Sequence, residues 1–149
     1  MEEERGRHLD RRLDEYEQQD ATRKTISDVL SSVPVPVAKR FPVRRHNRYW
    51  GYVYLMRINN EYCKIGYARD VRDRAAIFQI GTPYKIEVLH MISSHYAPRL
   101  ESLLQNRFAD RWVVGEWFKL SEEDISIIRA IESPVTAAEL DRIEGIEAD

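Results

Sequence analysis

The sequence has little cysteine, few glycines and no long apolar run. Its 149 residues include one cysteine, Cys63, so there is no internal disulfide and no cysteine-based zinc pattern. No apolar segment approaches the roughly 20 residues that a membrane-spanning helix needs. The charged N-terminus lacks the apolar stretch of a secretory signal. These absences predict an intracellular, cytoplasmic protein with no membrane partner, and they leave association with the nucleoid open.

The chain does contain charge of opposite sign in separate segments, although its formal net charge is only -2. Residues 39–74 carry 10 basic and 3 acidic side chains, a formal charge of +7. Residues 1–31 stand at -3 and residues 121–149 at -7. A basic field of this size attracts a phosphate backbone. The pattern favours a nucleic acid partner, and the alternative is that the acidic ends fold over the basic middle.

The clearest structural pattern is a hairpin that begins at Gly51. Residues 51–57 alternate as a strand does, with the side chains of Tyr52, Tyr54 and Met56 on one face. The pair Asn59-Asn60 that follows tolerates positive φ and predicts a turn. The hairpin should therefore direct one row of large side chains to each face of a sheet.

A returning strand and a helix complete this unit. Residues 62–67 predict the second strand, in which Gly66 allows a close backbone approach. Asp70 is placed to cap a helix that ends at residues 81–83, Gly-Thr-Pro. The hairpin and helix together bring a tyrosine, a lysine and an arginine towards one anionic point.

A third strand is predicted over residues 85–92. Its alternation places Ile86, Val88, His90 and Ile92 on one face.

The remaining sequence predicts helices around one closing strand. The predicted order β-β-α-β-α-β-α indicates an α+β fold, with a small, mainly antiparallel sheet flanked by helices and an N-terminal helical extension. These later elements are a helix over residues 97–108 with Leu100, Leu103, Leu104 and Phe108 on its apolar face, a turn and short strand over residues 112–120, a helix begun by a capping box at Ser121, and a short helix capped by Thr136 before an acidic tail.

The N-terminal segment, residues 1–31, is predicted to be helical but poorly buried. One thin apolar stripe is formed by Leu9, Leu13 and Tyr16, and a second begins at Ile26, Val29 and Leu30, all among dense charge. Such a helix could be a solvated extension, a contact in a homodimer or an arm that binds another protein. The sequence leaves these three readings open.

The segment between this helix and the hairpin contains prolines and then a basic stretch. Basic side chains interleaved with aromatic rings suit contact with a nucleic acid backbone and its bases, whereas a linker kept soluble by its charge is the alternative. The candidate residues for nucleic acid contact in and after this segment are Arg44, Arg45, Arg48, Tyr67, Arg69 and Arg72.

Several short motifs follow one another in the middle of the chain, and their order as a set is more specific than any one of them. They are Tyr52-Val53-Tyr54, Lys64-Ile65-Gly66, Arg74 ten residues after Lys64, Glu101 in the following predicted helix, and Gly115-Glu116-Trp117-Phe118.

This set resembles the GIY-YIG nuclease superfamily, and within it the phage and bacterial branch that has a KIG second motif and a closing GEWF segment. The resemblance implies an endonuclease that hydrolyses DNA phosphodiester bonds with one divalent metal ion, Mg²⁺ or Mn²⁺, and it does not exclude RNA. It implies that Glu101 holds the metal, that Tyr54 helps to activate water, and that Arg74 holds the scissile phosphate. Lys64 joins these three as a catalytic candidate.

General chemistry is compatible with each role. A guanidinium and a hard cation suit the negative charge of a phosphodiester transition state. Mg²⁺ keeps most of its waters, so a lone carboxylate can anchor it. Each residue also has an alternative without a catalytic role. Tyr54 could be a tyrosine of the core, Arg74 could pair with Asp70 or Asp73, and Glu101 could be a solvated carboxylate.

Four segments are predicted from these patterns. They are a charged helical extension over residues 1–31, a proline-containing basic arm over 32–49, a nuclease-like domain over 50–132, and a short helix with an acidic tail over 133–149. Two other functions stay open: a catalytically silent module that binds nucleic acid, and a protein-interaction factor of phage or defence origin.

Overall fold

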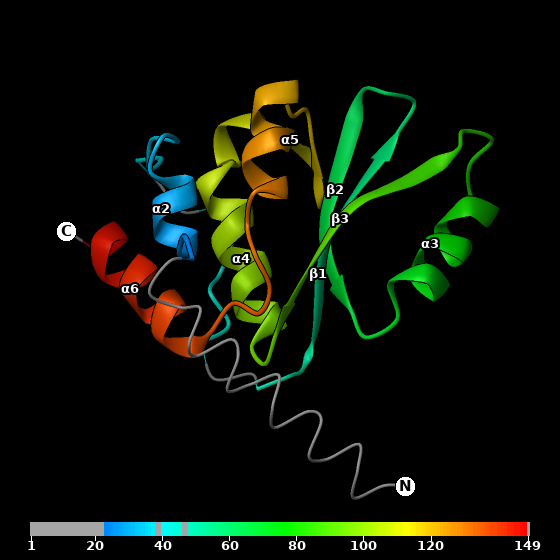
Figure 1. Ribbon diagram of the computed structural model, residues 1–149. Coiled ribbons are helices and arrows are strands. Elements are labelled where there is room, and N and C mark those ends of the chain that lie inside the picture. Colours follow the sequence, from blue (N-terminus) through cyan, green and yellow to red (C-terminus); the bar gives the residue numbers. More distant parts are fainter. Residues whose placement is uncertain (1–22, 38–39, 46–47, 149) are drawn as a thin grey trace, which may run out of the picture.

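The computed structural model describes residues 23–37, 40–45 and 48–148, and its centre is one five-stranded sheet in the order β3-β1-β2-β5-β4 (Figure 1). Neighbouring strands pair antiparallel throughout. The α+β fold with a small antiparallel sheet is confirmed. The strands are β1 (Gly51–Ile58), β2 (Tyr62–Ala68), β3 (Ile86–Ser94), β4 (Trp112–Val114) and β5 (Trp117–Phe118).

Helices lie on both faces of the sheet. Helices α4 and α5 cover one face, with α2 and α6 beyond α4, and α3 lies alone on the other side (Figure 1). In the described part of the chain, no helix is long and apolar enough to cross a membrane. The helices are α2 (Ile26–Leu30), α3 (Val71–Ile80), α4 (Ala97–Arg107), α5 (Glu122–Arg129) and α6 (Ala137–Ala148), with a short 3-10 turn, η1 (Ala109–Arg111), after α4.

The hairpin of β1 and β2 forms where the sequence predicts it. Asn59 and Asn60 adopt φ values of 55° and 53°, in the left-handed region that asparagine tolerates. The Asp70 side chain accepts a hydrogen bond from the Asp73 backbone N–H at 2.9 Å and begins α3. The polypeptide therefore turns sharply twice, and both turns are specified by nearby side chains.

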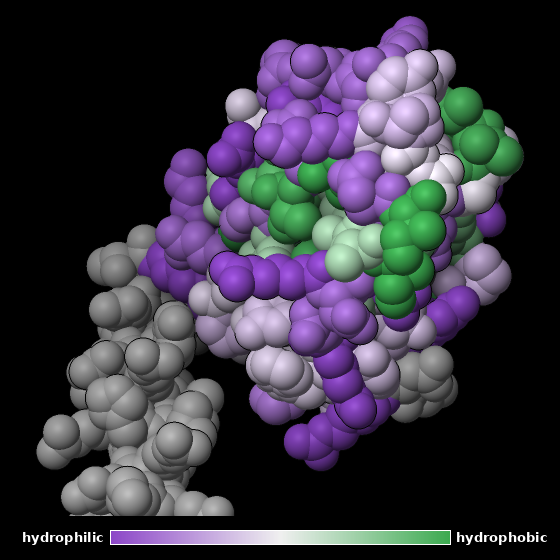
Figure 2. All heavy atoms as spheres, turned by 90° about the vertical axis from the view of Figure 1, so that its right-hand side faces the viewer, coloured by the Kyte–Doolittle hydropathy of each residue, from purple (hydrophilic) through white to green (hydrophobic). Residues whose placement is uncertain are grey.

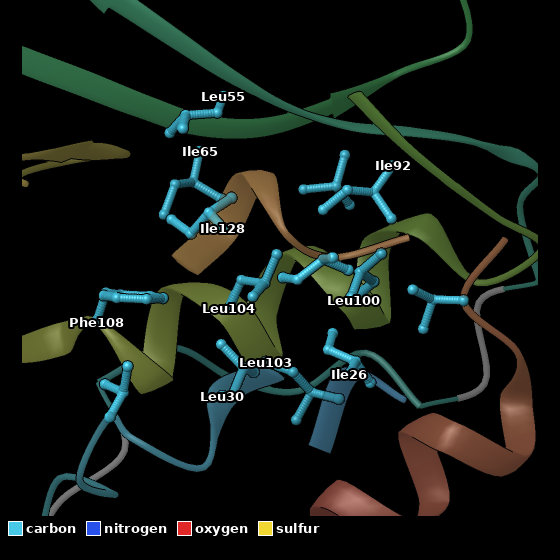
Figure 3. Close-up of a cluster of buried hydrophobic side chains, with 14 of the residues drawn as sticks. Ile26, Leu30, Leu55, Ile65, Ile92, Leu100, Leu103, Leu104, Phe108 and Ile128 are labelled. Carbon is cyan, nitrogen blue, oxygen red and sulfur yellow. The ribbon is translucent and has the colours of Figure 1, made fainter. Parts of the chain in front are cut away.

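The main hydrophobic core lies between the sheet and α4 (Figure 3). Leu55 and Ile65 project from the sheet towards Leu104 of α4, and each of the three is at most 2% exposed. Full burial of one such aliphatic side chain contributes about 1.5–3 kcal/mol. The core is continued on the far side of α4 by Ile26 and Leu30 of α2 (Figure 3).

The predicted poor burial of the second N-terminal stripe is wrong, because Ile26 and Leu30 are only 2% and 1% exposed. The helix is only 5 residues long, but its apolar residues belong to the main core, where α2 packs against α5 and α6. The dense charge around them in the sequence did not indicate this burial. The first stripe, formed by Leu9, Leu13 and Tyr16, lies outside the described residues.

Strand β3 departs from the predicted single apolar face. Leu55 pairs with His90, but the next residue, Met56, pairs with Val88, so the strand carries a bulge at residue 89. A bulge shifts the alternation by one residue. Ile86 and Val88 therefore share the α3 face with Met56, whereas His90 and Ile92 face the main core.

The C-terminal third also differs in two places. The predicted closing strand is a small hairpin of β4 and β5 that turns at Gly115, where φ is 56°. The predicted short last helix is α6 with 12 residues. It is longer because Leu140 and Ile143 are buried against the core and anchor it.

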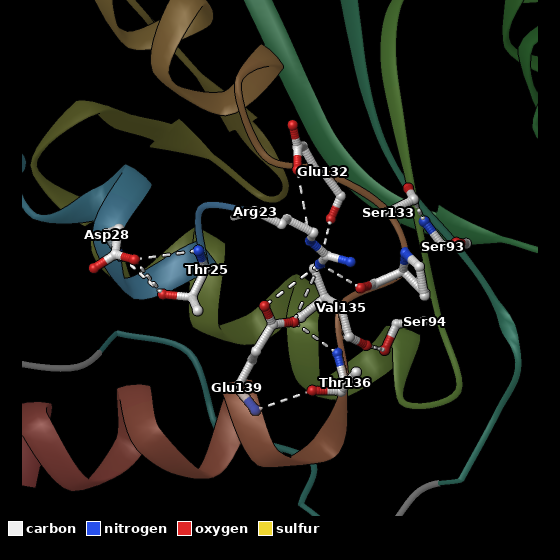
Figure 4. A network of polar contacts seen from close by, with 11 residues as sticks. Arg23, Thr25, Asp28, Ser93, Ser94, Glu132, Ser133, Val135, Thr136 and Glu139 are labelled. Carbon is white, nitrogen blue, oxygen red and sulfur yellow. Dashed lines mark hydrogen bonds and ion pairs between the residues drawn. The ribbon is translucent and has the colours of Figure 1, made fainter. Parts of the chain in front are cut away.

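A polar network ties the start of the described chain to the connection between α5 and α6 (Figure 4). The Arg23 guanidinium donates hydrogen bonds to the backbone carbonyls of Pro134 at 2.6 Å and Glu132 at 3.0 Å, and lies 3.4 Å from the Glu139 carboxylate. Ser94 on β3 donates to the Val135 carbonyl at 2.8 Å. Backbone groups outside the sheet are thus satisfied by side chains distant in sequence.

We expect Gly66→Ala to destabilise the fold by about 1–3 kcal/mol, the usual cost of overpacking a core. A Cβ on residue 66 would overlap the Tyr54 phenol ring, which lies directly across the strand pair. Urea unfolding measures the change. Gly145→Ala is the matched control, because no atom lies within 4 Å of its added Cβ; equal stability of the two variants would contradict the prediction.

Candidate functional site

The site is built around Tyr54 on β1. Tyr54 pairs with Gly66 on β2, and its ring lies so close to that glycine that a side chain there would overlap it. The tyrosine is only 2% exposed and packs with Met56, Ala68 and Val71 on the α3 side of the sheet. The close backbone approach predicted at Gly66 is confirmed, and its function is to give the phenol a fixed position.

The second part of the site is the edge of β2. Strand β5 pairs only with Cys63 and Lys64, so the edge of β2 is open beyond them. The next outward N–H, that of Ile65, donates to the Glu116 carbonyl at 3.2 Å. The Tyr67 backbone donates a hydrogen bond to the Glu101 carboxylate. A free strand edge thus supplies donors that hold a carboxylate from α4.

Glu101 is buried, with 5% of its surface exposed. Burial and the nearby negative charge of Glu116 raise its pKa to about 8, although Arg44, Lys64 and the Tyr67 hydrogen bond oppose this shift. The alternative of a solvated helix carboxylate is therefore wrong. Because Glu101 is buried and lies near the Glu116 carboxylate, its environment favours binding of a proton or a cation.

Lys64 connects the strand edge to α3. Its Nζ lies 3.6 Å from a carboxylate oxygen of Glu116 and 3.8 Å from the centre of the Phe78 ring. The ammonium is thereby held as a point charge between two elements, by an ion pair and a cation–π contact.

Arg74 approaches the same site from α3. Its side chain is exposed, and its positive charge acts on Tyr54. The Asp70 side chain instead caps the helix, and the described residues contain no ion pair of Arg74 with Asp70 or Asp73. The guanidinium is left available to an anion from solution.

The pKa of the Tyr54 phenol is raised above its usual value, first by burial and then by the charges of Glu116 and Glu101, against the opposing charge of Arg74. To accept a proton from water at neutral pH, a tyrosine would need a pKa below its ordinary value of about 10. The structure has the opposite shift, since burial outweighs the nearby cation. Tyr54 is a neutral hydrogen-bond donor at physiological pH.

The basic arm reaches this site. Asn106 on α4 holds Phe41 by two hydrogen bonds, one to its N–H and one to its carbonyl, both 2.8 Å long. Three residues later, Arg44 donates to the Tyr67 hydroxyl at 3.4 Å and lowers the pKa of Glu101. The arm is therefore docked on the domain and contributes a cation to the site.

The other candidate residues for nucleic acid contact are distributed around the start of β1. The Arg69 guanidinium lies 4.4 Å from the centre of the Tyr49 ring. Arg45 is paired with Glu144 at 2.8 Å, so its charge is partly neutralised. Arg48 and Arg72 are exposed.

Sequence reasoning gave too little weight to two groups of residues. Glu116 was named only as part of the closing motif, with no role of its own, yet its charge acts on both Glu101 and Tyr54. Gln105 and Asn106 are each 3% exposed, because α4 is buried on all sides, and they bind the edge of β2 and the arm. A run of polar residues at buried helix positions carries no periodic signal.

The donor chemistry fits a hard divalent cation. Within the described residues there is no group of three or more histidine, cysteine or acidic side chains that could hold a metal. Mg²⁺ is commonly bound through one or two carboxylates while it keeps several waters. Glu101 offers one such carboxylate and Glu116 lies near it, so these two residues would hold the ion.

Fold and site together define a small α+β domain with a buried carboxylate, a fixed phenol and several cations at one open strand edge. The model of the T5orf172 domain matches residues 51–132, more than half of the chain, and the chain therefore belongs to this family. No curated protein and no solved structure shows significant similarity to the chain. The family is associated with nuclease-like and DNA-binding modules, which supports a function directed at DNA in this general form.

The assignment to the GIY-YIG superfamily is wrong. The matching family is a different one, and no match to GIY-YIG was found. The motifs behind the resemblance are short, and some of their residues are required by the packing of the fold. A glycine must face Tyr54 because any side chain would overlap the phenol. Such constraints can give similar tripeptides in different families.

We expect the stability of the protein to fall with rising pH because of Glu101. The folded-state pKa of about 8 exceeds the ordinary glutamate pKa of 4.5, so the folded protein keeps a proton that the unfolded chain loses. The stabilisation is complete below pH 4.5 and is lost as the pH rises through about 8.

Thermal unfolding from pH 4 to 9 without divalent cations tests this prediction. Glu101→Gln, which cannot ionise, should gain Tm relative to the wild type as the pH rises. Glu123→Gln changes an exposed carboxylate on α5 and serves as the control. A constant Tm difference between Glu101→Gln and the wild type across this range would contradict the assignment.

Proposed function

We propose that the protein is an endonuclease that hydrolyses DNA phosphodiester bonds with the help of Mg²⁺ or Mn²⁺. The observation that carries the proposal is that a buried carboxylate, Glu101, and an exposed guanidinium, Arg74, are both near enough for their charges to act on the fixed Tyr54 phenol. Phosphodiester hydrolysis requires charge neutralisation at the phosphate and a placed water.

Each residue has a role that its environment allows. Arg74 binds the scissile phosphate by its planar fork, and Lys64 and Arg44 add positive charge beside it. Glu101, with Glu116 near it, holds the cation, which supplies charge neutralisation and polarises water. The neutral Tyr54 phenol donates a hydrogen bond that orients the attacking water or a phosphate oxygen.

A module that binds DNA without cutting it is the second candidate. The raised pKa of Tyr54 favours it, because the phenol cannot accept a proton at neutral pH. Under the nuclease proposal, the proton of the attacking water must therefore go to an acceptor other than Tyr54. Bulk solvent and an oxygen of the phosphate itself are two such acceptors.

We expect purified protein to nick supercoiled plasmid when Mg²⁺ or Mn²⁺ is added, and not when EDTA is present. Glu101→Ala and Arg74→Ala should each lower the rate by about 100-fold or more, the range for loss of one transition-state contact. Gel electrophoresis over time gives the rates.

Arg129→Ala is the matched control, since Arg129 is an exposed arginine at the end of α5, on the opposite face of the sheet from α3. Nicking that survives in Glu101→Ala would point to a contaminating nuclease. Intact plasmid under all conditions, with salt-sensitive binding retained, would replace the nuclease by the binding module.

A further inference from the structure

Trp50 is a large aromatic side chain that belongs to neither hydrophobic core cluster. It precedes β1 directly and is 45% exposed. Its ring lies 5.2 Å from that of Tyr52, at an interplanar angle of 72°. The edge-to-face contact with Tyr52 holds the indole in place, while its exposed part stays accessible to an external partner.

The Trp50 ring lies on the same face of the sheet as Tyr54. Tyr49 packs against the main core, whereas Tyr52 and Tyr54 belong to the cluster on the α3 side. Successive residues of a strand alternate between faces, and a strand rises about 3.3 Å per residue. Trp50, Tyr52 and Tyr54 therefore form one row, and Trp50 stands about 13 Å of strand from Tyr54.

Cations lie on the same side of the sheet as this row. Arg72 and Arg74 are exposed on α3, the helix on this face. Figure 2 shows the side of the molecule on which α3 lies, where strongly hydrophilic side chains adjoin apolar ones. Rings flanked by cations are the combination that binds single-stranded nucleic acid, because the cations follow the backbone and the rings stack on bases.

Whether the faces of the bases are accessible to a protein ring distinguishes single-stranded from duplex DNA as the substrate. In a duplex the faces of the bases are stacked on one another, so a protein ring reaches them only when a base is unpaired or flipped out. A contact with the backbone of an intact duplex would need cations alone.

We propose that Trp50, supported by Tyr52, is a stacking platform for an unpaired base, and that the substrate carries an unpaired nucleotide near the scissile phosphate. This inference rests on the proposed function, because it assumes that the scissile phosphate lies near Tyr54, at one end of the row of rings. It names single-stranded or locally unpaired DNA as the substrate class.

The test measures binding apart from cleavage. Fluorescence anisotropy in EDTA compares a labelled single-stranded oligonucleotide with the same sequence as a duplex. Trp50→Ala should weaken single-strand binding by roughly 10- to 100-fold, the effect of one lost base stack, and leave duplex binding unchanged. Trp50→Phe should restore most of the single-strand affinity.

Tyr84→Ala is the control, because Tyr84 is a 50% exposed aromatic at the opposite end of the sheet. A 2-aminopurine in the oligonucleotide should be quenched by the wild type and by Trp50→Phe but not by Trp50→Ala. Thermal unfolding checks that the variants are folded.

Unchanged single-strand affinity in Trp50→Ala, or equal losses for single strand and duplex, would overturn the inference. So would self-association of the wild type through Trp50 in sedimentation without any effect on DNA binding. Trp50-dependent stacking in a protein that cuts no DNA would overturn the nuclease proposal alone. Equal cutting of single-stranded or locally unpaired DNA by the wild type and Trp50→Ala would overturn the platform alone.

Discussion

The contact of Tyr54 with Gly66 is the constraint on which the candidate site depends. The two residues pair directly across β1 and β2, and the absence of a side chain at residue 66 lets the phenol lie against the strand. This contact fixes the tyrosine where the charges of Arg74 on α3 and Glu101 on α4 both act on it. The site is therefore set by strand register, and a shift of one residue would move Tyr54 to the other face.

The open edge of β2 explains why charged groups are buried there. Strand β5 is only 2 residues long, so the backbone groups of β2 beyond Lys64 need other partners. The Glu116 carbonyl, the Glu101 carboxylate and the Gln105 amide supply them. A buried carboxylate is costly in most folds, but here it satisfies a strand edge and remains close to cations. Structural and functional demands are met by the same atoms.

Charge segregation along the sequence has two outcomes in the fold. The acidic C-terminal helix does fold back on basic residues, because Glu144 pairs with Arg99 and with Arg45 of the basic arm, each at 2.8 Å. Arg44, the neighbour of Arg45, turns the other way and reaches Tyr67 at 3.4 Å. The arm is thus anchored by one arginine and presents the next to the site, so part of the basic middle stays available for an anion.

The sequence alone determined what depends on near neighbours. The turn at Asn59-Asn60, the cap at Asp70 and the α+β order follow from local backbone preferences and alternation. The candidate residues Tyr54, Arg74 and Glu101 were found through a resemblance whose family assignment was wrong. Only the tertiary structure decided the bulge that turns His90 to the core, the burial of Ile26, the direction of the pKa shifts and the part played by Glu116. These depend on segments that are distant in sequence, and burial and electrostatic environment exist only once those segments pack.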